Sequence, residues 1–412
     1  MKICIIGAGA SGLMAAITAL RLGAKVTLME ENKKAGKKIL STGNGKCNYT
    51  NVNLKPKHFH LEKALNTFEV IEKFNSNEII DFFRQLGIEP FIREGYVYPN
   101  SEQASSILEA LLNECERLGV KLFTGVEISK IVKEKNTFKI SYLVEEKTEI
   151  AFFDKVIISS GSKVGVSKPN ENIIKILKGF NLKYNEFLPA LCGVCCEEKA
   201  FFKNCFGVRT RATLSLQLSK NEIKKEYGEL QLTDYGLSGI PTFQLSRYIS
   251  RFLKNKQDVN IEVNFLPHIE DVKLFLKARY ENRFFKDLLA FGNGLLNKKL
   301  WYAILLKLKL KPELDIRNMR VCEVESIIEK LARAITKMNF KITGTMGFDK
   351  AQVCTGGIDL SEINFKDMQL KKVSGMYLAG EIIDVDGICG GYNLSWAWAS
   401  GHLAGECAAK ER

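Results

Sequence analysis

Three glycines near the N-terminus have the spacing that a phosphate-binding turn requires. Residues 7–12 read GAGASG, so Gly7, Gly9 and Gly12 form the pattern G-x-G-x-x-G. The first glycine permits a tight bend, the second lets a pyrophosphate approach the backbone, and the third lets a helix pack closely on the preceding strand. Glu30 follows at a distance where a carboxylate can accept hydrogen bonds from an adenosine ribose. The spacing therefore predicts a dinucleotide site.

These residues need a strand before the turn and a helix after it. Residues 2–6 (KICII) are nearly all apolar, as expected of a strand buried in a parallel sheet. Residues 13–22 are rich in Ala, Leu and Met and should form a helix whose N-terminus faces the phosphates. Residues 25–29 (KVTLM) form a second strand that ends at Glu30. Small residues interrupt the apolar run and no cleavage-like spacer follows it, which argues against a signal peptide or membrane span.

The composition is that of a globular protein with room for two or three domains. The 412 residues are 46% hydrophobic and 26% charged, and we find no low-complexity tract or internal repeat. Eleven cysteines in a long chain suggest reduced thiols, and we expect a cytoplasmic protein. The net charge of +13 could favour an anionic substrate, an NADPH phosphate or RNA. Because no basic motif is interleaved with aromatic residues, nucleic acid is not the expected partner.

The one cysteine cluster consists of Cys192, Cys195 and Cys196 in an apolar, strand-like run. A C-x-x-C pair could be redox-active or supply half of a metal site, but no second pair or nearby histidine completes one. The four histidines of the chain are dispersed. We therefore expect these cysteines to be structural and no metal to be bound.

A long polar loop, residues 32–51, follows the second strand. Loops of this length inside compact domains are usually functional. Backbone N–H groups of residues 41–45 could reach phosphate or flavin oxygens, and Lys37 or Lys38 could neutralise charge. Further on, residues 156–161 (VIISSG) read as another buried strand ending in a turn, as at the carboxyl edge of a doubly wound sheet.

The pattern changes from residue 188 and returns near the C-terminus. Strand-like segments predict a β-rich domain, and residues 269–335 read as several helices. Residues 375–379 then have the form of a buried strand, and Gly390 and Gly391 precede a helix of small and aromatic residues. The N-terminus of that helix could hold an electronegative group such as the pyrimidine end of a flavin, although a closely packed core helix would also explain its composition.

Three motifs make the chain recognisable. They are residues 42–51 (TGNGKCNYTN), residues 228–239 (GELQLTDYGLSG) and residues 379–398 (AGEIIDVDGICGGYNLSWAW). The chain resembles, over its whole length, the bacterial FAD-binding oxidoreductases labelled aminoacetone-oxidase-like, which include a bile-acid dienone reductase. The resemblance implies an α/β fold with a Rossmann-like FAD domain of the glutathione-reductase type, a β-rich insertion and a helical subdomain. The implied domains are 1–189 with 348–412 for FAD, 190–264 with 334–347 for the β-rich insertion, and 265–333 for the helices.

The sequence departs from the family pattern in two ways, in the segment beside the expected flavin site and at Lys46. The turn at residues 159–162 reads SSGS where the family often has Ala-Thr-Gly-Gly, and residues 168–174 replace a Gly-Ser-Thr-Gly-Asp-Gly stretch. Lys46 also replaces the usual arginine.

The motifs and the resemblance together give a set of expected site residues. No residue has the signature of a required general acid, and the candidates for catalysis are Tyr392, Tyr235, Arg209 and Arg211. The expected cofactor contacts are Gly7, Gly9, Ala10, Ser11, Gly12, Glu30, Lys37, Lys38, Ser41, Thr42, Gly43, Cys47, Asn48, Val126, Gly161, Gly380, Glu381, Gly391, Tyr392, Asn393 and Leu394.

The function implied is that of an NAD(P)H- and FAD-dependent oxidoreductase. The flavin would take a hydride from NAD(P)H and pass it to a small organic acceptor with an enone-type C=C, the class that the bile-acid member suggests. Only one dinucleotide fingerprint is present, so NAD(P)H would visit the flavin transiently. Two alternatives stay open: a flavoprotein that modifies RNA, suggested by the basic charge, and a non-catalytic flavin scaffold or sensor. The sequence does not indicate an oligomeric state.

Overall fold

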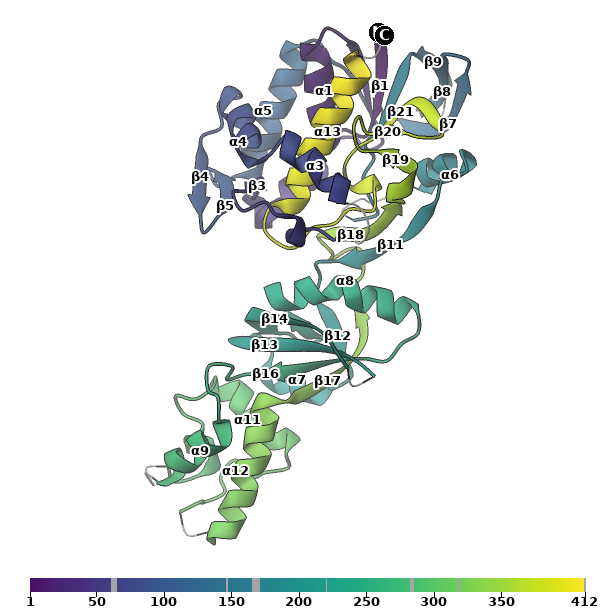
Figure 1. Ribbon diagram of the computed structural model, residues 1–412. Coiled ribbons are helices and arrows are strands. Elements are labelled where there is room, and N and C mark those ends of the chain that lie inside the picture. Colours follow the sequence, from purple (N-terminus) through teal and green to yellow (C-terminus); the bar gives the residue numbers. More distant parts are fainter. Residues whose placement is uncertain are drawn as a thin grey trace. The chain divides into compact units, whose positions relative to one another are not determined.

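The computed structural model describes residues 1–60, 65–145, 147–164, 171–219, 221–281, 285–317 and 319–410. The chain forms two compact units, residues 1–188 with 352–412 and residues 189–351. Both chain ends lie in the first unit (Figure 1). The α/β fold expected from the sequence is confirmed, while the finer division of residues 189–351 into a β-rich and a helical domain stays a prediction.

A seven-stranded sheet forms the centre of the first unit, in the order β19-β20-β21-β10-β1-β2-β6. The five adjacent strands from β21 to β6 pair in parallel. Strand β20 pairs antiparallel with both of its neighbours, β19 and β21. The predicted strands at 2–6 and 25–29 are present, and most of their residues are buried. The strands are β1 (Lys2–Ile6), β2 (Lys25–Glu30), β6 (Lys121–Thr124), β10 (Lys155–Ile158), β19 (Ile363–Asn364), β20 (Gln369–Leu370) and β21 (Val373–Leu378).

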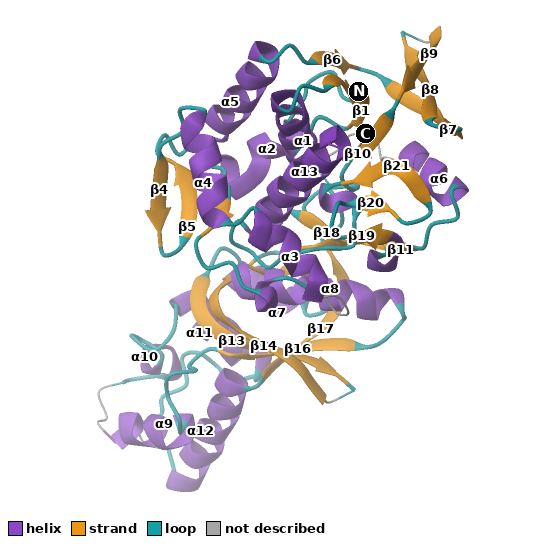
Figure 2. Ribbon diagram, turned by 45° about the horizontal axis from the view of Figure 1, so that its top comes forward, coloured by secondary structure: helices purple, strands orange, loops and turns teal. Residues whose placement is uncertain are grey.

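Two helices from opposite ends of the chain, α1 (Ala10–Arg21) and α13 (Tyr392–Lys410), lie side by side (Figure 1 and Figure 2). Glycines allow this approach: a Cβ on Gly401 would lie 2.3 Å from the carbonyl oxygen of Ser11, and one on Gly405 would lie 2.4 Å from that of Ala15. Close packing therefore explains the glycines at positions 401 and 405 of α13.

Smaller elements complete the first unit. The stretch expected as one long loop, residues 32–51, contains two short helices. Gly36 precedes the first with φ 68°, and its N–H group donates to the carbonyl of Ala8. In the segment 168–174, where the sequence departs from the family pattern, residues 168–170 lie outside the described residues and residues 171–174 lie in α6. The helices are α2 (Lys37–Ser41), η1 (Thr42–Gly45), η2 (Pro56–His58), α3 (Leu65–Lys73), α4 (Ser76–Gln85), α5 (Ala104–Arg117), α6 (Glu171–Gly179), η3 (Leu360–Glu362) and η4 (Gly380–Ile382).

The remaining strands of this unit form small sheets with the orders β3-β5-β4 and β7-β8-β9, and β18 pairs with β11. Strands β7 to β9 form an antiparallel meander. Their bounds are β3 (Thr50–Asn51), β4 (Pro90–Arg93), β5 (Tyr96–Pro99), β7 (Glu127–Glu134), β8 (Thr137–Val144), β9 (Lys147–Phe153), β11 (Tyr184–Ala190) and β18 (Val353–Ile358).

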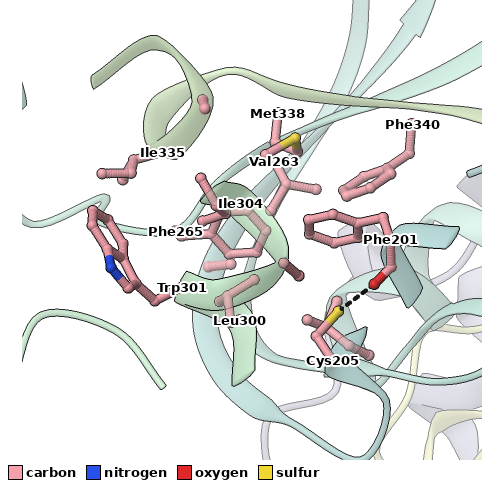
Figure 3. Packing of buried hydrophobic residues seen from close by; sticks show 14 of the residues in the cluster. Phe201, Cys205, Val263, Phe265, Leu300, Trp301, Ile304, Ile335, Met338 and Phe340 are labelled. Atoms are coloured by element: carbon pink, nitrogen blue, oxygen red, sulfur yellow. Dashed lines mark hydrogen bonds between the residues drawn. The ribbon is translucent and has the colours of Figure 1, made fainter. Parts of the chain in front are cut away.

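The second unit is a closed barrel with helices packed around it, in the strand order β12-β15-β14-β13-β16-β17. Figure 3 shows part of its core, where Trp301 and Phe340 are buried. The indole N–H of Trp301 donates to the carbonyl of Leu288 (2.7 Å). The strands are β12 (Val194–Cys196), β13 (Arg209–Leu218), β14 (Asn221–Leu232), β15 (Gly236–Ser238), β16 (Val259–Asn264) and β17 (Met338–Thr345). The helices are α7 (Lys199–Cys205), α8 (Ile240–Lys254), α9 (Val272–Glu281), α10 (Leu288–Phe291), α11 (Lys298–Lys307) and α12 (Val321–Thr336).

Candidate functional site

A cavity of about 170 Å³ lies in the first unit where β1, β2, β10 and β21 end. Open α/β sheets bind ligands at this edge. The structure brings many of the expected residues to its wall, from both halves of the unit. These are Gly7, Gly9, Ala10, Ser11, Glu30, Lys37, Lys38, Thr42, Gly161, Glu381, Asn393 and Leu394.

The glycine turn has the geometry that a pyrophosphate needs. Gly7 adopts φ 102°, and a Cβ on Gly12 would lie 1.9 Å from the Gly7 carbonyl oxygen, so the turn and α1 touch through their backbones. Gly9 is different, because a Cβ there would meet no heavy atom within 4 Å and Gly9 lines the cavity. No side chain caps the N-terminus of α1 at Gly9. The open backbone and uncapped helix end fit an anionic phosphate group.

Glu30 is held by the same turn. It is 8% exposed, and its carboxylate accepts hydrogen bonds from the N–H of Ala8 (2.8 Å) and from the N–H (2.9 Å) and Nδ2 (2.6 Å) of Asn32. A second, smaller cavity shares Gly7, Glu30 and Asn32 with the first and extends to Val126. The N–H of Val126 already donates to the Glu30 carbonyl (2.9 Å), so only its other atoms are available to a ligand.

An ion pair forms part of the cavity wall. The ammonium of Lys38, on α2, contacts the Glu381 carboxylate, on η4. The second oxygen of Glu381 accepts a hydrogen bond from the N–H of Cys354 (2.9 Å). Gly380, beside it, does not line the cavity but lies so close to α1 that a Cβ would be 2.4 Å from the Ser11 hydroxyl.

The start of α13 is organised differently from the sequence expectation. Asn393 reaches the cavity wall, but its side chain holds the preceding loop: Oδ1 accepts from the N–H of Gly387 (2.8 Å) and Nδ2 donates to the Gly387 carbonyl (3.0 Å). Tyr392 is not among the cavity-lining residues, and its ring packs 4.7 Å from the His58 ring. A Cβ on Gly391 would lie 2.6 Å from the carbonyl of Thr50, so Gly391 also serves packing.

Four further expected contacts, Ser41, Gly43, Cys47 and Asn48, are not among the residues that line the cavity. Ser41 donates its hydroxyl to the Lys38 carbonyl (2.9 Å), and Asn48 accepts from the N–H of Val97 (3.2 Å). Gly43 packs against the N–H of Asn48. Cys47 is fully buried, and burial raises the pKa of its thiol to about 12. As direct cofactor contacts these residues stay predictions.

The remaining candidates lie in the second unit. Arg209 is ion-paired with Glu229 (2.8 Å), Arg211 is an exposed residue of β13, and the ring of Tyr235 packs on Gly193. Their catalytic roles stay predictions. Cys192 and Cys196 are buried and Cys195 is half-buried, all as free thiols. Among the described residues, no group of three or more His, Cys, Asp or Glu side chains is arranged to hold a metal ion.

The sequence reasoning missed several residues of the cavity wall. Asn32 had a local signal, since a polar side chain two positions after Glu30 can bond its carboxylate. Ser159 donates its hydroxyl to the carbonyls of Ile6 (3.0 Å) and Gly7 (2.9 Å), which no local pattern reveals. The other wall residues that the sequence reasoning missed are Ala8, Gly36, Ile39, Ser160, Ser162, Val164, Gln352, Val353, Val385, Trp396 and Ala397.

Within the described part of the chain, no helix has the length and apolar character to cross a membrane.

Comparisons with known proteins agree with this architecture. The family described as "HI0933-like protein Rossmann domain" matches residues 1–407. The chain is 35% identical to a "3-dehydro-bile acid delta(4,6)-reductase" from Clostridium scindens, over 99% of both chains. It is 27% identical to a "Ribosomal RNA dihydrouridine synthase" from Haemophilus influenzae, over 97% of this chain and 96% of that protein.

A solved structure shares the fold. The crystal structure of a 3-ketosteroid-Δ4-(5α)-dehydrogenase from Rhodococcus jostii RHA1 superposes with a TM-score of 0.51 at 14% identity, covering 99% of this chain and 96% of that one.

Proposed function

Since the chain belongs to the HI0933-like family of Rossmann-domain proteins and is an FAD-dependent oxidoreductase, we propose that it reduces a C=C bond conjugated to a carbonyl in a small organic acceptor. The hydride would come from NAD(P)H. The observation that carries this proposal is the 35% identity, over 99% of both chains, to the protein named a bile-acid Δ4,6-reductase. A 3-oxo steroid with Δ4 and Δ6 double bonds is a conjugated dienone, which accepts hydride at a carbon remote from its oxygen.

The residues around the cavity would each do a separate task. When bound, FAD supplies the hydride-transfer chemistry. Gly9 and the uncapped N-terminus of α1 would hold its pyrophosphate, and Glu30 would bind the adenosine ribose. Asn393 would keep the loop at Gly387 in place beside the cavity. Since residues 7–12 carry the only dinucleotide fingerprint of the sequence, NAD(P)H would bind without a domain of its own.

Anaerobic stopped-flow absorbance tests this function. NADH or NADPH should bleach the flavin, and a 3-oxo-4,6-diene bile acid should restore its colour under the same anaerobic conditions. NADH or NADPH deuterated at C4 of the nicotinamide ring should transfer one deuterium to a carbon of the product, which mass spectrometry detects. Bleaching without reoxidation by the dienone would refute the proposed acceptor, and the absence of bleaching by either nucleotide would refute the donor.

A second candidate acceptor is a uracil base in RNA, whose C5=C6 bond is also conjugated to a carbonyl. Besides the relative named for ribosomal RNA, one surface segment favours it. Residues 288–312 contain no Asp or Glu but five lysines, at positions 298, 299, 307, 309 and 311, all of them exposed. Within the described residues these lysines make no ion pair with a carboxylate. The ammonium of Lys299 lies 5.6 Å from the ring of Phe206, which is 55% exposed.

The two acceptors are distinguished by one pair of assays. Reduced protein is mixed with either the dienone or an unmodified ribosomal RNA transcript, and the products are examined for a gain of two hydrogens. RNA as the acceptor also requires binding that weakens steeply with salt, because lysine–phosphate contacts release counterions. The double variant Lys298→Ala/Lys299→Ala should reduce that binding without affecting turnover of the dienone.

A further inference from the structure

The Lys38–Glu381 ion pair joins segments that the sheet holds far apart. Lys38 lies on α2, which follows β2, and Glu381 lies on η4, which follows β21. The strand order β21-β10-β1-β2 puts two strands between them. With neighbouring strands about 4.8 Å apart, the two side chains meet across roughly 14 Å of sheet edge. The pair therefore crosses the ends of β1 and β10, where the glycine turn and residues 159–162 begin.

Both partners are fixed in place. The Glu381 carboxylate accepts one hydrogen bond from the N–H of Cys354 (2.9 Å) and one from Lys38. Helix α2 is tied to the glycine turn, because the N–H of Gly36 donates to the carbonyl of Ala8 (2.8 Å). The side chains are 31% exposed for Lys38 and 19% for Glu381, so water screens the pair only in part.

The Lys38 ammonium keeps donors to spare. It carries three N–H groups, and its one protein partner among the described residues is Glu381. Both Lys38 and Glu381 line the cavity together with the glycine turn. By contrast, the neighbouring Lys37 is an exposed residue. A fixed ammonium with free donors beside an uncapped helix N-terminus is suited to an anionic ligand group.

We propose that Glu381 is a positioning residue that holds Lys38 in place, so that the free N–H groups of Lys38 bind the pyrophosphate of a dinucleotide. The inference rests on the proposed use of this cavity for FAD. It assigns Glu381 a different task from the one expected from the sequence, since the carboxylate acts through Lys38 and makes no cofactor contact of its own. Lys38 then complements the backbone N–H groups of α1 from the other side of the ligand.

Titration of the apoprotein with three probes tests the proposal. ADP contains the pyrophosphate without a flavin, riboflavin contains the flavin without a phosphate, and FAD contains both. For Lys38→Met we expect affinity for ADP and FAD to fall about tenfold or more, and affinity for riboflavin to be unchanged. Lys38→Arg should restore much of the loss because it keeps the cation. Lys34→Met removes an exposed lysine from the same loop and serves as the matched control.

The positioning role is read from a double-mutant cycle. Glu381→Gln should weaken ADP binding to a similar degree, and the double variant should bind no more weakly than Lys38→Met alone. Additive losses would mean that Glu381 contacts the ligand directly, and tighter ADP binding by Glu381→Gln would mean that it competes with phosphate for Lys38; either result overturns the proposal. Unchanged ADP affinity in a folded Lys38→Met variant also overturns it. If the wild-type apoprotein binds neither FAD nor ADP, the proposed use of the cavity fails as well.

Discussion

Two glycines in one turn should respond to alanine in opposite ways. Gly9 has φ −85° and ψ −165°, which any residue can adopt, and a Cβ on Gly9 would meet no protein atom within 4 Å. A Cβ on Gly12 would lie 1.9 Å from the Gly7 carbonyl oxygen. Gly9→Ala should therefore fold normally and lose FAD, whereas Gly12→Ala should be unstable even without FAD.

The magnitudes follow from these surroundings. Alanine is a poorer N-cap than glycine by roughly 0.5–1 kcal/mol, and the less flexible unfolded chain offsets about 0.4–1 kcal/mol of that. The apoprotein of Gly9→Ala should thus unfold within about 1 kcal/mol of wild type. For Gly12→Ala the helix must move away from the turn, and overpacking of this kind costs about 1–3 kcal/mol or more.

Ligand binding gives the larger signal for Gly9→Ala. At a hundred times its dissociation constant, FAD stabilises the wild-type protein by about 2.7 kcal/mol. If the added methyl raises that constant a hundredfold, the same FAD concentration stabilises the variant by only about 0.4 kcal/mol. Thermal unfolding of the apoprotein and of the protein with added FAD, together with a fluorescence titration of FAD, measures both quantities.

Two results would refute the reasoning. Wild-type FAD affinity in Gly9→Ala would mean that the pyrophosphate does not approach this backbone. An apoprotein of Gly9→Ala as unstable as that of Gly12→Ala would mean that the space at Gly9 is needed for folding and not for the ligand.

Three further predictions concern other residues of the first unit. Because burial raises the pKa of Cys47 to about 12, iodoacetamide at pH 8 should label the exposed Cys322 and leave Cys47 unmodified by mass spectrometry. Hydrogen bonds from Arg117 and Arg21 outweigh the opposing effect of burial and hold the pKa of Glu114 below its usual 4.5. Folding therefore favours the carboxylate form, so Glu114→Gln should lower the Tm at pH 7, and the difference should shrink as the pH falls below 4.5 and through the lowered pKa. Tyr392→Phe should leave the reduction potential of the flavin unchanged, because Tyr392 does not line the cavity; a shifted potential would mean that Tyr392 contacts the flavin.

The elements around the cavity that the sequence predicts correctly are those coded by neighbouring residues. The glycine turn, its two strands and Glu30 lie within thirty residues of one another, and their spacing reflects backbone geometry that few other residues permit. Strand β1 could be identified because a strand buried on both faces is apolar throughout. Such signals need no knowledge of the rest of the fold.

The local sequence does not predict which side chains point into the cavity. Tyr392 and Asn393 are adjacent, yet Asn393 reaches the cavity wall and Tyr392 packs on His58. Gly390 and Gly391, with φ 126° and 89°, set the angle at which the chain enters α13, and this angle decides which residue points inward. In the same way Lys37 and Lys38 cannot be told apart until Glu381 is brought to one of them from far along the chain.

The structure also shows where part of the excess positive charge of the chain lies. The charged residues on the cavity wall are Glu30, Lys37, Lys38 and Glu381, two of each sign, so the net charge of +13 is not concentrated there. The acid-free segment 288–312 instead carries five exposed lysines in the second unit. Cofactor binding and any binding of a polyanion therefore depend on different residues. If the proposed cofactor contacts are right, added salt should weaken binding of a polyanion much more than binding of the cofactor, because the cofactor would be contacted by backbone N–H groups and by a lysine with a fixed counter-ion.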